Sequence, residues 1–65
     1  MKNEAAYKKA LAMAAAVLRD DIEEAALWDF CYVNGVSMCE LWRDDDIVGF
    51  MIEDDPFYYE DYKED

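Results

Sequence analysis

Apolar residues recur at helical spacing through the first third of the chain. On a helical wheel drawn for residues 4–19 they gather on one side. That side has a central stripe of Tyr7, Leu11, Ala14 and Leu18, flanked by Ala6, Ala10, Met13 and Val17. Asn3 is a suitable N-cap for such a helix, and its many alanines are strong helix formers. The pattern therefore predicts an amphipathic helix over about 4–19 with a broad buried face.

A second helix is predicted over about 22–33, and its apolar residues cover nearly the whole circumference. Asp21 and Glu24 have the spacing of a capping box at its start, with Asp21 as the cap. Gly35 is the residue type that usually follows a helix C-terminus. A helix that is apolar all round is normally central to a fold. We therefore expect the C-terminal segment, or a second copy of the chain, to cover it.

The segment from Val36 is compatible with two structures. Ser37 and Glu40 have capping-box spacing and would begin a short third helix. The apolar run at 47–52 has the length of a strand, and the three aspartates before it are typical of a turn. We favour a β-hairpin with strands near 38–43 and 47–53. From Pro56 onward, one or two helical turns and an extended tail fit the sequence equally well.

Together these elements predict an α+β fold in a single domain over residues 1–65. Two N-terminal helices pack on a C-terminal β-hairpin over about 38–53, and an acidic, tyrosine-rich tail or short helix follows over 54–65. A chain of this length buries only about 60% of the surface that its unfolded form exposes. The core should therefore be thin, and a large internal active site is not expected.

The charge of the chain is strongly negative and unevenly placed. Its net charge is −11, and residues 44–65 hold ten of the 17 acidic residues but only one base, Lys63. Such a charge exceeds the magnitude of roughly 2–8 that suits the solubility of a small domain. Direct binding to nucleic acid or to an anionic membrane is disfavoured, because both would repel the chain. The expected partners are cations or a basic protein surface.

Candidate catalytic residues are few. The chain has no histidine, and carboxylates near Cys31 and Cys39 in the sequence would disfavour formation of a reactive thiolate. We therefore expect no enzymatic activity and no cofactor, with both cysteines reduced and buried as small apolar residues in a cytoplasmic protein. No segment has the length of a membrane span.

Some of the aspartates match part of a calcium-binding loop. Asp44, Asp46, Gly49 and Asp55 occupy positions 1, 3, 6 and 12 of an EF-hand loop. Position 5 is the apolar Val48, and position 12 lacks the usual bidentate glutamate. A small acidic structural or calcium-binding protein is therefore an alternative that the sequence does not favour.

The acidic and aromatic residues near the C-terminus form the candidate site. An extended chain advances roughly 3.3 Å per residue, which is close to the roughly 3.4 Å between phosphates along one strand of B-DNA. A run of aspartates therefore carries charge at nearly the density of a DNA strand. Exposed tyrosines would add aromatic anchors to such an interface. The predicted partner-binding residues are Asp44, Asp45, Asp46, Glu53, Asp54, Asp55, Tyr58, Tyr59, Glu60 and Asp61.

Three acidic clusters, at 44–46, 53–55 and 60–65, alternate with the aromatic residues Phe50, Phe57, Tyr58 and Tyr59. In a short, histidine-free chain, this layout resembles the acidic DNA-mimic inhibitors of phages and prophages, among which anti-CRISPR proteins are a well-populated class. The resemblance covers the whole chain in layout and composition, and no specific motif carries it.

The resemblance implies a stoichiometric inhibitor, monomeric or homodimeric, in the cytoplasm of a host bacterial cell. Such an inhibitor would occupy the basic nucleic-acid-binding surface of a CRISPR-Cas complex and block target DNA binding. An antitoxin-like neutraliser of a basic toxin is the alternative within the same binding class.

Overall fold

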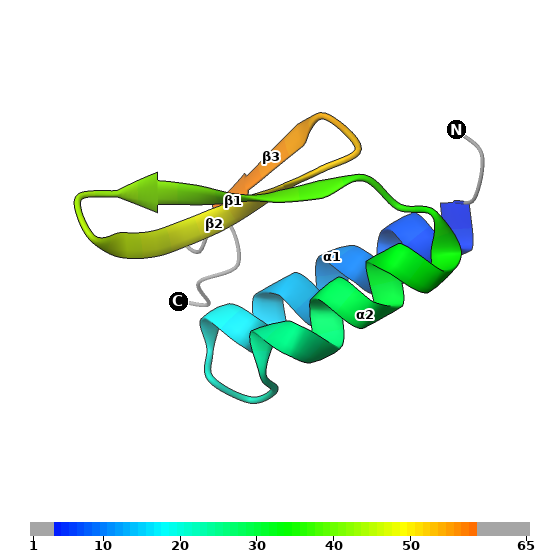
Figure 1. Ribbon diagram of the computed structural model, residues 1–65, viewed down its shortest axis with the longest axis horizontal. Coiled ribbons are helices and arrows are strands. Elements are labelled where there is room, and N and C mark those ends of the chain that lie inside the picture. The colour runs from blue at the N-terminus through cyan, green and yellow to red at the C-terminus, as the bar shows by residue number, and fades with distance from the viewer. Residues whose placement is uncertain (1–3, 59–65) are drawn as a thin grey trace, which may run out of the picture.

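The computed structural model describes residues 4–58, in which a pair of antiparallel helices packs against a three-stranded antiparallel sheet (Figure 1). The elements are α1 (Glu4–Leu18), α2 (Glu24–Asn34), β1 (Met38–Arg43), β2 (Asp46–Ile52) and β3 (Asp55–Tyr58). The predicted α+β class, with two N-terminal helices on a C-terminal sheet, is confirmed. Within the described residues, neither helix is long and apolar enough to cross a membrane.

The first helix supplies a shared packing surface, because α1 contacts both α2 and β2. Its buried residues are Ala6, Ala10, Ala14 and Ala15. The predicted buried side of the helix is thus confirmed, but small alanines form its centre and larger residues such as Leu11 and Met13 lie partly buried beside them. Since the distance between packed helices depends on the side chains in contact, this alanine stripe allows close approach.

The second helix begins later than the sequence predicts. Its N-cap is Glu23, whose side chain makes no capping hydrogen bond. Asp21 does not cap the helix as the sequence predicts, because α2 begins three residues later, at Glu24. The Asp21 carboxylate instead accepts a hydrogen bond from Arg19 Nε at 3.1 Å within the connecting loop. The predicted end is correct: Gly35 adopts φ 68°, and its N–H donates to the Tyr32 carbonyl. The Val36 N–H donates to the Cys31 carbonyl, which completes a Schellman motif.

Within the described residues α2 is not the central helix, and its cover by a second copy of the chain stays a prediction. Only Leu27 and Cys31 are buried on it, whereas Trp28, Tyr32 and Val33 have 41%, 88% and 78% of their surface exposed. An apolar circumference shows what a helix can bury, but α1 occupies only one side of it. The described part of the C-terminal segment does not cover the rest, since it pairs with β2 as a third strand.

The predicted β-hairpin is confirmed, and the alternative third helix is excluded because residues from Met38 onward form β1. Its strands join through a two-residue turn at Asp44 and Asp45. Val48 is an extra residue in β2, where the register shifts opposite Leu41 and Trp42, as in a β-bulge.

The third strand replaces the tail or helix expected after Asp55. β3 pairs antiparallel with β2, opposite Gly49–Ile52. Pro56 is tolerated there because β3 is an edge strand. The sheet contributes Phe50, Ile52 and Phe57 to the same core as Leu27.

Between β2 and β3 the chain turns through two residues with left-handed backbone, Glu53 (φ 53°) and Asp54 (φ 72°). Positive φ at both central residues is the signature of a type I′ turn, which glycine or asparagine normally occupies. Two hydrogen bonds hold Glu53 in this conformation: its N–H donates to the Ser37 carbonyl, and its carboxylate accepts the Ser37 N–H, both at 2.8 Å. Glu53 therefore extends the β1–β2 pairing by one residue pair.

We expect Gly49→Ala to lower the free energy of unfolding by about 1–3 kcal/mol, the usual cost of overpacking. A Cβ at this position would overlap the Phe57 carbonyl oxygen and lie 2.9 Å from Tyr58 Cα, both backbone atoms that the β2–β3 pairing fixes. Gly35→Ala is the matched control, because its φ is positive but no atom lies within 4 Å of the added Cβ. Its expected cost is about 1 kcal/mol. Urea unfolding measures both values, and a smaller loss at Gly49 than at Gly35 would contradict the β2–β3 packing.

We expect Glu53→Ala to destabilise the protein by about 1 kcal/mol, since it removes the acceptor of the Ser37 N–H and keeps the same backbone strain. Glu53→Gln retains an amide oxygen at that place and should cost less. Asp54→Ala is the control, because it changes the neighbouring turn residue without removing the Ser37 contact. Equal stability of the Ala and Gln variants of Glu53 would show that its carboxylate does not support the fold.

Candidate functional site

The predicted partner-binding residues separate to opposite ends of β2. Asp44, Asp45 and Asp46 lie at the β1–β2 turn, and Glu53, Asp54 and Asp55 lie at the β2–β3 turn. Seven residues of strand place these two clusters about 20 Å apart. Tyr59, Glu60 and Asp61 lie outside the described residues.

This separation bears on the calcium-loop alternative. Asp44 and Asp46 stand at one end of a strand and Asp55 follows the other end, so their carboxylates cannot converge on one ion as an EF-hand requires. Among residues 4–58 no group of three or more metal-ligating side chains is placed to hold a metal ion.

Two acids at the β2–β3 turn make hydrogen bonds within the fold. Asp55 accepts a hydrogen bond of 2.8 Å from the Tyr7 hydroxyl, which ties β3 to α1. Glu53 binds Ser37 as described above. Two of the three predicted acids in this cluster therefore have structural partners, while Asp54 is exposed at the turn.

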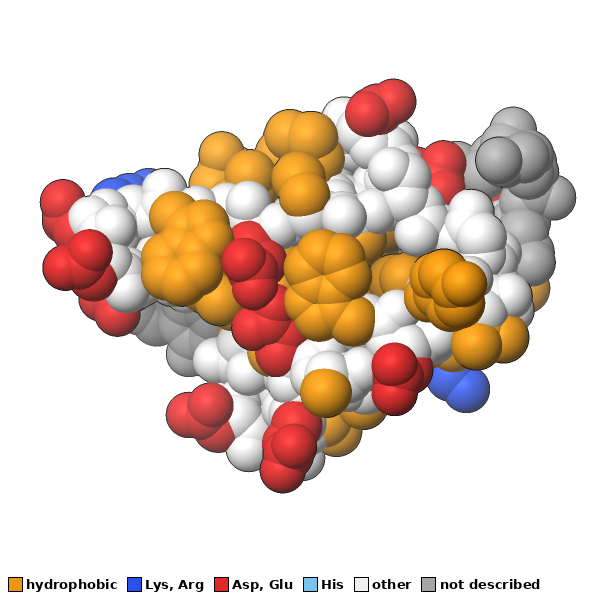
Figure 2. Space-filling view, in the orientation of Figure 1, with side chains coloured by type: hydrophobic (Ala, Val, Ile, Leu, Met, Phe, Trp, Pro, Cys, Tyr) orange, Lys and Arg blue, Asp and Glu red, His pale blue; other side chains and the backbone are white. Residues whose placement is uncertain are grey.

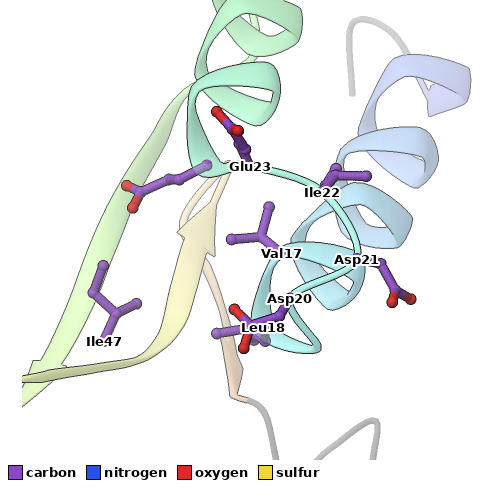
Figure 3. Close-up of a pocket in the computed structure, with 8 residues that line it drawn as sticks. Val17, Leu18, Asp20, Asp21, Ile22, Glu23 and Ile47 are labelled. Atoms are coloured by element: carbon purple, nitrogen blue, oxygen red, sulfur yellow. The ribbon is translucent and has the colours of Figure 1, made fainter.

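The helix-to-helix loop brings further acids to the β1–β2 end of the molecule. A surface hollow of about 670 Å³ lies between this loop and β2, with Asp20, Asp21 and Glu23 in its lining. Val17, Leu18 and Ile47 supply apolar parts of the lining, and Figure 3 shows the loop beside Val17 and Leu18 with Ile47 across from them. These acids were not among the predicted site residues.

A second hollow, of about 520 Å³, adjoins the first and shares Leu18, Asp20 and Ile47 with it. Asp46 and Tyr58 also line this hollow, so the structure does bring two of the predicted residues together. Tyr58 is 39% exposed. We call the set Asp20, Asp21, Glu23, Asp44, Asp45 and Asp46 the acidic end.

The acidic end suits the side chains of lysine and arginine. Such side chains lay their methylene stems along apolar surface and keep the charged group among polar atoms. Val17, Leu18 and Ile47 offer the apolar surface, and the surrounding carboxylates offer the acceptors. The bases within this end are Arg19, which is paired with Asp21, and Arg43.

The cysteines differ from one another. Cys31 is buried, and burial followed by the negative charge of Glu53 raises the pKa of its thiol, which disfavours the reactive thiolate. Cys39 is exposed, so the prediction that both cysteines are buried is wrong for this residue. Cys39 lies between Met38 and Glu40 in β1, and both of these residues are partly buried. Because successive side chains of a strand point to opposite sides of the sheet, the Cys39 side chain lies on the other side.

A second surface, which the sequence analysis missed, lies where α2 and β1 come together. The Trp28 indole N–H donates to Glu24 at 2.7 Å, and the Trp42 indole N–H donates to Glu40 at 3.1 Å. The neighbouring Glu24 carboxyl favours the protonated form of Glu40 and so raises the pKa of Glu40, with a smaller contribution from desolvation, and the hydrogen bond from Trp42 opposes this shift. We call Glu24, Trp28, Tyr32, Glu40 and Trp42 the aromatic face.

This pairing was not visible in the sequence, because Glu24 and Glu40 belong to different elements. The available signal was the spacing of Glu24, Trp28 and Tyr32, which places them on one stripe of α2. Only the packing of α2 against the fold shows that this stripe stays in solvent.

Comparison with known proteins gives no relative: no protein-family model, no curated protein and no solved structure matches this chain.

Proposed function

We propose that this chain is an acidic DNA-mimic inhibitor that binds the basic nucleic-acid-binding surface of a protein and blocks target DNA binding. The acidic end is the part that makes the contact. The observation that carries the proposal is that Asp20 of the helix-to-helix loop and Asp46, the first residue of β2 after the β1–β2 turn, line one hollow at the same end of the molecule.

The negative charge of this surface is poorly neutralised by the chain itself. Residues 4–58 contain thirteen acids and four bases. Lys8 is paired with Glu4 at 3.5 Å, and Lys9 lies over the Phe30 ring at 5.4 Å from its centroid. Both lysines lie on α1, outside the acidic end, where Arg19 and Arg43 are the two bases beside six acids. A basic groove would therefore gain attraction over several ångströms before any contact forms.

The spacing of the acids supports comparison with a nucleic acid backbone. The two turns at the ends of β2 are about 20 Å apart, which corresponds to about six phosphate steps along one strand of B-DNA. The helix-to-helix loop adds charge beside the first of these turns. A protein that binds phosphates along a groove would therefore meet the two acidic turns at positions about six phosphates apart.

A CRISPR-Cas effector is the partner class that we propose first, and that choice rests on the resemblance in layout and composition. A basic toxin presents a similar surface, so an antitoxin-like neutraliser is the alternative. The two are distinguished by whether the displaced ligand is a target DNA duplex held by an effector complex.

The decisive prediction concerns Asp45 and Asp46. The wild-type chain should displace a labelled target duplex from a susceptible CRISPR-Cas effector, with an apparent affinity that falls as salt is raised. Asp45→Asn with Asp46→Asn should weaken this competition about tenfold or more, since losing about 1.4 kcal/mol is tenfold in affinity. Fluorescence anisotropy of the duplex across a salt series measures both effects.

Glu4→Gln with Asp29→Asn is the matched control, because it removes the same number of charges from exposed helix positions outside the acidic end. It should change the competition less than about twofold. The proposal fails if no effector in a panel of CRISPR types releases its duplex, if competition is insensitive to salt, or if both double variants lose the same affinity.

A further inference from the structure

The aromatic face lies outside the hydrophobic core, and the fold leaves its large aromatic side chains uncovered. Glu40 and Trp42 alternate with Leu41 in β1, and Glu40 pairs with Phe50 across the strands. Since paired residues of an antiparallel sheet share a side, Glu40 stands on the same side as the buried Phe50. Trp42 follows it on that side and is nevertheless 57% exposed. The edge of the sheet at β1 therefore extends beyond the helices that cover its centre.

The side chains on this face form a connected set held by hydrogen bonds. Each indole N–H donates to one carboxylate, and the carboxyls of Glu24 and Glu40 neighbour each other. Figure 2, which views α2 and β1 from the front, shows acidic side chains lying between hydrophobic groups on this face. Because these rotamers are already fixed, a ligand would meet them with little further loss of conformational entropy.

We propose that the aromatic face docks a protein segment that inserts an arginine side chain between Trp28 and Trp42, against the carboxyls of Glu24 and Glu40. The occupant is a basic segment of another protein. This proposal goes beyond the proposed function, because it does not require the acidic end to mimic DNA, and Glu24 is the one residue of the aromatic face that also lines the first hollow.

Charge decides between a basic segment and a second copy of this chain. Two copies that met through this face would bring four carboxyls together in a desolvated contact, between chains that each carry a net charge of −11. A cation in the same place would instead relieve the repulsion between Glu24 and Glu40. The aromatic rings reinforce this preference, since an indole face attracts cations.

Arginine fits this arrangement better than lysine. Its planar guanidinium presents donors in a rigid fork that can reach two carboxylates at once, and it stacks on aromatic rings. Lysine offers a single, more strongly hydrated ammonium group. Tyr32, 88% exposed and one turn beyond Trp28, extends the same stripe for the apolar residues of the segment.

The test uses the full chain and a labelled helical peptide composed of arginine, leucine and alanine. Trp28 and Trp42 are the chain's two tryptophans, so intrinsic fluorescence reports on this face directly. We expect a saturable change in fluorescence with the arginine peptide. The peptide in which citrulline replaces arginine, with the same shape and no charge, should bind about tenfold or more weakly, and the lysine peptide should lie between them.

Variants separate the aromatic face from general attraction to an acidic protein. Glu40→Gln keeps an acceptor for the Trp42 indole and removes the charge. It should weaken binding of the arginine peptide about tenfold. Asp45→Asn with Asp46→Asn removes more charge from the acidic end and should change peptide binding less than about twofold. Circular dichroism of each variant establishes that it is folded.

Three results would overturn the proposal. One is equal binding of the arginine and citrulline peptides. Another is a loss of arginine-peptide affinity in the Asp45→Asn, Asp46→Asn double variant that is as large as the loss in Glu40→Gln. That result would indicate nonspecific attraction to an acidic protein. The third is a dimer in sedimentation that Tyr32→Ala dissociates, since a second copy would then cover the face. None of these results bears on displacement of DNA by the acidic end, so the two proposals succeed or fail separately.

Discussion

The rest of this fold depends on the packing of α2 and β2 against one stripe of alanine methyl groups on α1. Ala6, Ala10 and Ala14 recur every four residues and are buried, and the helix that carries them contacts both α2 and β2. Small side chains let both layers approach one helix, which is how so short a chain buries Phe50, Leu27 and Ile52 completely. One helix has a limited circumference, however. What α1 does not reach, the outer side of α2 and the edge of the sheet at β1, remains in solvent.

The negative charge divides according to the same architecture. Glu53 and Asp55 stand where the sheet meets the rest of the fold, and each accepts a hydrogen bond from Ser37 or Tyr7. These two carboxylates link β3 to α1 and the β2–β3 turn to the residue before β1. Asp44 and Asp45 occupy a turn that projects from the sheet, and the helix-to-helix loop meets the same end of the molecule. Repulsion among the acids of that end lowers stability, and within residues 4–58 Asp44 and Asp45 accept no hydrogen bond like those of Glu53 and Asp55. This is the physical reason to assign that end to a partner.

The sequence predicted elements better than it predicted surroundings. Local rules placed Gly35 after α2, the apolar run of β2 in a strand and the alanine face of α1 in the core, because each depends on neighbours a few residues away. The predicted Asp21 cap is wrong because α2 begins only at Glu24, after a loop in which Asp20 has left-handed backbone. β3 was left open between a helix and a tail, since Pro56 suits a first helical turn as well as an edge strand. The exposure of Trp28 could not be read from periodicity, which shows an apolar face without showing what covers it.

The two surfaces meet at the start of α2, where Glu23 belongs to the acidic end and Glu24 to the aromatic face. They act over different ranges. Carboxylates at an exposed turn attract a basic protein over distances of about a Debye length, roughly 8–10 Å at physiological salt, and so govern the rate of encounter. Indoles held by hydrogen bonds act only in contact, where they slow dissociation. A partner with a basic groove beside an arginine-bearing segment would use both, and raising the salt would then reduce its association rate more than it increases its dissociation rate.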